Sequence, residues 1–196
     1  MKSGIWRAGL VAAAIACSAG VAQAQPTAGA KDDTTGMFCV YNTLAQSGDA
    51  DMVAKVFLYD DTPEELIGRS AVVLDRTTTE CAAAHKVTLS KSASMADMGL
   101  YGSVIDYLSK ELKAAGASAK ALKAMFGVFD ELSDEEHDKF FEADWRSDVE
   151  FTGKMRKGLI AAGIPKKDEA IDTALTMFEV SAMADQAIFT FLVDDL

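Results

Sequence analysis

The most regular pattern of apolar and polar positions lies near the C-terminus, between Pro165 and Val193. Apolar residues recur there at steps of three and four, which is the period of an α-helix. These positions are Ile171, Leu175, Phe178, Ala182, Phe189 and Leu192. Further apolar residues cover the flanking faces, so we expect other helices to surround this one. Glu179 and Asp185 interrupt the run before the roughly 18 apolar residues that a membrane span requires. The pattern therefore predicts a central bundle helix and no transmembrane segment in the mature chain.

The same period can be followed upstream as far as Gly36. It predicts a first helix from Gly36 to an interruption at residues 47–49, and a short second helix that carries Met52 and Val56. Residues 56–59 also have the composition of a β-strand. The chain offers that strand no partner run bounded by turn residues, so we favour the helix.

The third helix has the clearest start in the sequence. Thr62 supplies a capping hydroxyl, Pro63 suits the first helical position, and Glu65 follows three residues after the cap. The apolar stripe then continues to about Leu89, and residues 90–94 read as a loop.

Four further helices are marked by polar starts and glycine ends. Ser94 and Ser118 are expected to cap the next two helices, and Gly116 to end the first of them. A capping box at Ser133 predicts a long helix that continues to Ala162 and is ended by Gly163, and the final helix follows. The sequence therefore predicts an all-α fold: a single-domain bundle of six or seven helices with a long C-terminal antiparallel helical hairpin at its centre.

The N-terminal residues have a different pattern, that of an export signal. Residues 1–24 combine a basic start, an apolar middle and a small-x-small cleavage site ending at Ala24. Residues 25–35 are small and polar and predict a disordered tether ahead of a domain at 36–196. An alternative is a lipoprotein anchored at Cys17, because residues 14–17 resemble a lipid-attachment site. Both readings place the protein outside the cytoplasm, in the periplasm of a bacterial envelope or secreted.

The charge balance narrows the range of partners. The chain has 19 basic and 30 acidic residues, and the signal contains two of the basic ones, so the mature formal charge is −13. Such a surface repels nucleic acid and anionic lipid and favours basic partners. Nothing in the sequence identifies the partner or the oligomeric state, and no cofactor is expected.

Cysteine usage agrees with export. Without Cys17, the chain keeps Cys39 and Cys81, an even pair that predicts a disulfide in an oxidising compartment. Closing a loop of about 40 residues stabilises a fold by roughly 4 kcal/mol on the chain-entropy model. A redox-active or metal-binding pair is the alternative, but the sequence has no Cys-x-x-Cys motif.

A metal site is the candidate chemistry that the helix predicted over residues 133–162 suggests. Asp144 and Asp148 fall inside its apolar arc, where carboxylates are costly unless they are paired, hydrated or bound to a cation. Asp134 and His137 lie within one turn of each other, and His85 is the obvious donor from another helix. The alternative is a set of structural ion pairs, with Arg156, Arg69 and Arg76 as the nearest choices of partner.

Two weaker signals concern sulfur ligands. Met95 and Met98 are spaced to offer thioethers to copper, although methionine more often fills a core. Cys81 and His85 lie one turn apart, which suits zinc or a nucleophile–base pair, but a disulfide would consume the thiol.

Common catalytic signatures are missing from the sequence: a glycine-rich phosphate loop, Gly-x-Ser-x-Gly, His-Glu-x-x-His and Cys-x-x-Cys-His. We therefore expect a non-enzymatic envelope protein that binds a protein partner or small ligand through a helical groove. The alternative is a metal-binding bundle, with or without catalytic activity, that uses Asp144, Asp148, His137 and His85.

Overall fold

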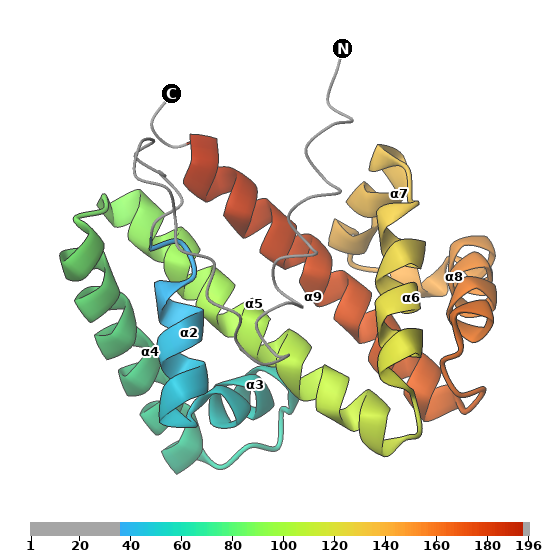
Figure 1. Cartoon of the computed structure of the whole chain (residues 1–196), viewed down its shortest axis with the longest axis horizontal. Coiled ribbons are helices and arrows are strands. Elements are labelled where there is room, and N and C mark those ends of the chain that lie inside the picture. Colours follow the sequence, from blue (N-terminus) through green and yellow to red (C-terminus); the bar gives the residue numbers. More distant parts are fainter. Residues whose placement is uncertain (1–35, 194–196) are drawn as a thin grey trace.

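The computed structural model describes residues 36–193, and every regular element in that range is helical (Figure 1). The α-helices are α2 (Cys39–Ser47), α3 (Ala50–Leu58), α4 (Glu64–His85), α5 (Leu89–Ala114), α6 (Ala119–Asp130), α7 (Asp134–Asp138), α8 (Val149–Ala162) and α9 (Asp168–Val193). Two short 3-10 helices, η1 (Lys139–Phe141) and η2 (Trp145–Ser147), lie between α7 and α8. The all-α prediction is confirmed, with eight α-helices in the described range instead of six or seven. The predicted signal and tether lie outside the described residues.

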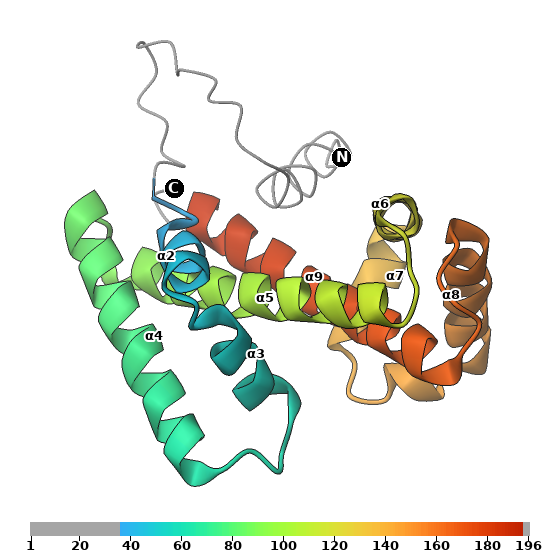
Figure 2. The same ribbon diagram turned by 60° about the horizontal axis from the view of Figure 1, so that its bottom comes forward.

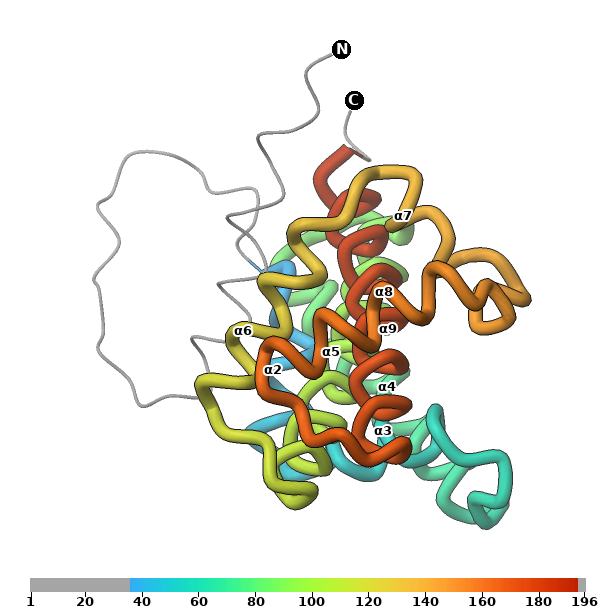
Figure 3. The backbone as a smooth tube through the Cα atoms, turned by 90° about the vertical axis from the view of Figure 1, so that its right-hand side faces the viewer, coloured from blue at the N-terminus to red at the C-terminus, as the bar shows by residue number. Residues whose placement is uncertain are grey.

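Two long antiparallel helices, α5 and α9, form the centre of the structure (Figure 1). Helices α2, α3 and α4 pack at one end of this pair, and α6, α7 and α8 at the other. Figure 2 shows the same division from a second direction, and Figure 3 looks onto the α6–α8 end. Each end has its own cluster of buried apolar side chains. The central pair therefore connects two separately packed regions.

Helix α9 is the core helix that the sequence predicted, but its main partner is α5, not α8. Both α5 and α9 have 26 residues and can pack along their full lengths, whereas α8 has only 14. Phe189 was expected on the buried stripe and is 64% exposed. The buried face shifts to Ala187, Ile188 and Phe191 in the last turns, because α9 there meets the N-terminal cluster. Within residues 36–193, α9 is also the one helix long and apolar enough to pass as a membrane span.

Several helix ends lie where the sequence placed them. Gly116 and Gly163 adopt φ values of +107° and +97°, in the left-handed region that glycine enters without steric cost. Ser118 caps α6 by accepting a hydrogen bond from the Ala121 N–H, and Ser133 forms the predicted capping box at the start of α7.

Other ends were predicted wrongly. The Thr62 hydroxyl does not cap α4, because it donates to the carbonyl of Tyr59 at 2.7 Å. Helix α4 ends at His85, four residues earlier than expected, and Lys86 follows in the left-handed conformation. Thr88 then caps α5, so Ser94 is a buried residue inside that helix and not its cap.

The largest correction concerns residues 133–162, which do not form one helix. The chain leaves helical geometry at Glu142 (ψ 133°) and again at Asp148 (ψ 95°). The break allows Phe140, Trp145 and Phe151 to turn into one cluster, with ring centroids 5.0–6.1 Å apart. A single straight helix would place these three side chains along a length of about 16 Å. Aromatic burial therefore outweighs helical continuity in this segment.

The predicted disulfide between Cys39 and Cys81 is present and joins α2 to α4. The two Cα atoms are 5.8 Å apart, in the usual range for such a bond. Cys81 is 3% exposed, so the bond lies inside the N-terminal cluster.

Candidate functional site

The residues that suggested a metal site do not come together. Asp134 lies in the first turn of α7, and Asp144 is exposed in the loop before η2. His137 belongs to the α6–α8 end, whereas His85 ends α4 at the opposite end of the α5–α9 pair (Figure 1). Among the described residues, no three histidine, cysteine, aspartate or glutamate side chains are placed to hold a metal ion.

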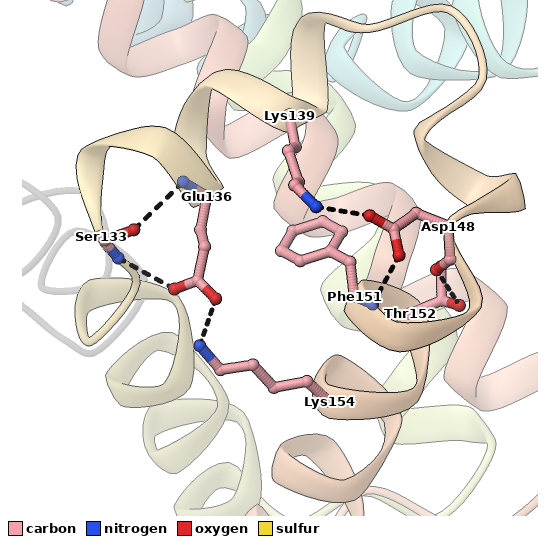
Figure 4. Close-up of polar contacts among 7 residues, drawn as sticks. All are labelled: Ser133, Glu136, Lys139, Asp148, Phe151, Thr152 and Lys154. Atoms are coloured by element: carbon pink, nitrogen blue, oxygen red, sulfur yellow. Dashed lines mark hydrogen bonds and ion pairs between the residues drawn. The ribbon is translucent and has the colours of Figure 1, made fainter.

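Asp148 has a structural role, which agrees with the ion-pair alternative and not with the metal-site hypothesis. Its Oδ1 accepts a hydrogen bond from the Phe151 N–H at 2.9 Å, which caps α8. Its Oδ2 accepts from the Lys139 ammonium group (Figure 4). The ion-pair alternative is therefore confirmed for Asp148, with Lys139 as the partner and not an arginine. Arg156 and Arg69 pair with other acids, Asp168 and Asp49.

The two histidines have different surroundings. The His137 ring is 8% exposed and packs edge-on against Phe129, with centroids 4.5 Å apart. His85 is exposed, and its ring lies so close to Gly36 that a Cβ at that position would overlap it. Each ring thus packs at its own end of the fold.

The sulfur-containing candidates are also used in packing. Met95 and Met98 are 0% and 3% exposed and belong to the N-terminal apolar cluster, as expected of core methionines. The Cys81 thiol is consumed by the disulfide.

An open hollow of about 560 Å³ lies between the α7–η1 segment and α8. Figure 4 shows that two charged pairs link its walls: Lys139 with Asp148, and Lys154 with Glu136. The Phe151 ring lies beneath the Lys139 ammonium group, 5.1 Å from it. Each lysine of these pairs is matched by a carboxylate from the facing wall.

The pairs change the proton affinity of their carboxylates. The Lys154 hydrogen bond, helped by the Ser133 N–H, lowers the pKa of Glu136. The Lys139 hydrogen bond, helped by the Phe151 N–H, lowers the pKa of Asp148, and the same pair raises the pKa of Lys139. Both carboxylates are therefore held ionised as helix caps and ion-pair partners. The two ion pairs join the α7–η1 segment to α8 across the hollow.

A second concavity, of about 270 Å³, lies between α3 and the start of α4. Its apolar walls come from Met52 and Val56 on α3 and Leu66 on α4. Arg69 and Lys55 stand at its edges: Arg69 lies 3.6 Å from a carboxylate oxygen of Asp49, and Lys55 is held over the Tyr107 ring. We refer to this concavity as the α3–α4 groove.

Large apolar side chains in and beside the groove are partly exposed. Leu66 is 39% exposed, and the neighbouring residues Phe57 and Ile67 are 41% and 45% exposed. The buried positions of α4 begin at Ser70 and continue with Val73, whereas Leu66, one turn earlier on the same face, is only partly covered. Figures 2 and 3 show this end of α4 and the loop before it projecting from the body of the molecule.

Reasoning from sequence missed the α3–α4 groove because periodicity reports which residues share a face, not which face stays uncovered. One usable signal was present: the apolar pair at residues 66–67 follows four acidic residues within positions 60–65. Charged residues are mostly exposed, so the apolar pair beside this run is expected to lie near the surface.

Comparison with known proteins adds no assignment: no protein-family model, no curated protein and no solved structure matches this chain.

Proposed function

We propose that this chain is an exported, non-enzymatic protein of the bacterial envelope that binds a protein partner through the α3–α4 groove. The observation that carries the proposal is the position of Leu66: it extends the buried face of α4 by one turn and lies partly exposed in the groove with Met52 and Val56. Apolar surface left open beside polar and charged residues is characteristic of binding sites.

The other chemistry-bearing side chains support a binding role over a catalytic one. Asp148 and Glu136 act as helix caps and ion-pair partners, and Cys81 is bonded to Cys39. Asp148 and Glu136 stabilise the α6–α8 end, and the disulfide stabilises the end of the fold that carries the groove.

The disulfide supports export, because such bonds persist in oxidising compartments. Intact-mass analysis of the protein from its own host tests this part. We expect a chain that begins at Gln25 and contains one disulfide. A lipid-modified chain that begins at Cys17 would indicate membrane anchoring instead of secretion. A chain that keeps Met1 would contradict export.

Photo-crosslinking tests the groove. A photoreactive amino acid at position 66 should give a discrete adduct with one host protein, whereas the same group at Val72 should not. Val72 is the matched control because it is an exposed aliphatic residue on the same helix outside the groove. The captured protein should then bind the purified chain, and Leu66→Asn should weaken that binding more than Val72→Asn. Equal adducts at both positions, or none at position 66, would contradict the proposal.

A further inference from the structure

The position of the α3–α4 groove between two helices suits the docking of a third helix. The apolar floor of the groove is supplied by Met52, Val56 and Leu66. The channel between two packed helices accepts a row of side chains from a third helix, which is how amphipathic helices dock in grooves.

The charge around the groove is negative. Asp60, Asp61, Glu64 and Glu65 flank Thr62, which lines the groove, and all four are exposed. Within residues 36–193, none of the four has a lysine or arginine at ion-pair distance. The two cations at the groove already have partners: Arg69 faces Asp49, and Lys55 lies over the Tyr107 ring.

Helix stabilisation explains only part of this acidic run. Glu64 and Glu65 lie in the first turn of α4, where negative charge favours the helix dipole. Asp60 and Asp61 precede the helix and gain little from it. Their charge is therefore available to a partner, and the formal charge of −11 for the whole chain steers cations toward the surface as well.

We infer that the partner segment is a basic amphipathic helix. Its apolar side packs on Met52, Val56 and Leu66, and its lysine or arginine side chains face the carboxylates of residues 60–65. This inference rests on the proposed function and adds the chemistry of the partner to it.

Binding of synthetic peptides to the purified, disulfide-bonded protein tests the inference. The probe is a leucine–alanine–lysine peptide of about 14 residues, with leucines at helical spacing, which as a helix extends roughly 21 Å. A matched peptide replaces every lysine with glutamate. Amide chemical shifts locate the contact, and titration gives the affinity. We expect the basic peptide to perturb the amides of α3 and the start of α4, and the acidic peptide to leave them unchanged.

Two charge-reversal variants separate local from overall charge. Asp60→Lys/Asp61→Lys should weaken binding of the basic peptide about tenfold, because it replaces attraction by repulsion at the groove. Glu131→Lys/Asp144→Lys carries the same net charge, but its exposed positions lie at the α6–α8 end. This control should bind within about twofold of the unchanged protein. Leu66→Asn should lower the affinity for the basic peptide by about tenfold or more.

Each contrary outcome has a distinct meaning. Equal binding of both peptides, with Leu66→Asn still weakening each, would overturn the basic partner and leave groove docking in place. No perturbation by the basic peptide at about 1 mM would overturn the basic helix, while crosslinking at position 66 separately decides the proposed function. Sedimentation that shows a dimer abolished by Leu66→Asn would assign the groove to a second copy of this chain.

Discussion

The two groups of helices that cover the α5–α9 pair are held by different interactions. At the N-terminal end, the Cys39–Cys81 bond joins α2 to α4, and the buried cluster consists mainly of aliphatic and methionine side chains, including Met95 and Met98 of α5. At the C-terminal end, α6–α8 and the 3-10 turns surround a set of aromatic rings. These rings are Phe129, Phe140, Trp145, Phe151 and Phe178.

The difference shows two ways of completing a small core. Aromatic side chains bury much area each and favour edge-on contacts, so a broken segment such as residues 134–148 can still be ordered by packing. Arg146 adds a polar tie, because its guanidinium group reaches Asp172, Thr176 and Glu179 on α9 at 2.7–3.0 Å. The N-terminal cluster has one buried aromatic ring, Phe191, among aliphatic and methionine side chains, and this end also has a covalent bond. The α4 segment before that bond is left projecting, with the groove at its start.

Of the changes that test this comparison, removal of a central aromatic ring should lower the free energy of unfolding most. Phe140 is 2% exposed and contacts Phe129, Trp145, Phe151 and Phe178. We expect Phe140→Ala to lower the free energy of unfolding by about 4–5 kcal/mol, the upper part of the range for buried aromatic residues. Urea denaturation measures the change. Phe141→Ala is the matched control, because that neighbouring ring is 49% exposed, and it should cost less than about 1 kcal/mol. Similar losses in both variants would contradict the aromatic core.

Loss of the disulfide should have the next largest effect, on the opposite end. Cys39→Ala/Cys81→Ala should lower the free energy of unfolding by about 3–4 kcal/mol, because the bond closes a separation of 42 residues. Hydrogen exchange should then become faster mainly in α2 and α4. The double variant should no longer respond to reducing agent, which provides the control. Equal acceleration in α6–α8 would show that the two ends are not separately stabilised.

A close helix contact at the N-terminal end should be sensitive to a single methyl group. A Cβ at Gly99 would overlap Val40, whereas a Cβ at Gly127 in α6 would meet nothing within 4 Å. We expect Gly99→Ala to destabilise by about 1–3 kcal/mol through overpacking, despite the better helix propensity of alanine. Gly127→Ala should stabilise by up to about 1 kcal/mol. Thermal melts of both variants measure the difference, and a gain in both would mean that α2 and α5 are less closely packed than the structure shows.

The helix caps of the C-terminal end should give the smallest effect, and one that depends on pH. Ser133→Ala should cost about 1 kcal/mol at neutral pH, because α7 loses its capping oxygen. The pKa values of Glu136 and Asp148 are lowered in the folded state, so their contribution is present above the unfolded values near 4.5 and 3.8. It is lost as pH falls through the lower folded values. Urea midpoints at pH 7, 5 and 3 should therefore converge for Glu136→Gln and the unchanged protein as the solution is acidified. A constant difference across these pH values would contradict the pairing with Lys154.

The sequence by itself determined the features that depend on residues close together in the chain, and the disulfide, for which only one pair of cysteines was available. Helical periodicity predicted the all-α class, and glycines 116 and 163 marked helix ends because their side-chain-free backbone enters the left-handed region. Ser118 and Ser133 were recognised as caps from their local pattern. The disulfide followed from there being one pair of cysteines, Cys39 and Cys81, outside the predicted signal.

Only the tertiary structure decided which helix faces pack together and where a predicted helix is interrupted. The segment around Asp144 and Asp148 has helical periodicity, but the burial of Phe140, Trp145 and Phe151 in one cluster outweighs it, and Asp148 becomes a cap. The choice of α5 as the partner of α9, and the uncovered end of α4, depend on contacts between residues far apart in the chain. Periodicity carries no information about such contacts, because it records the direction of a side chain and not what lies opposite it.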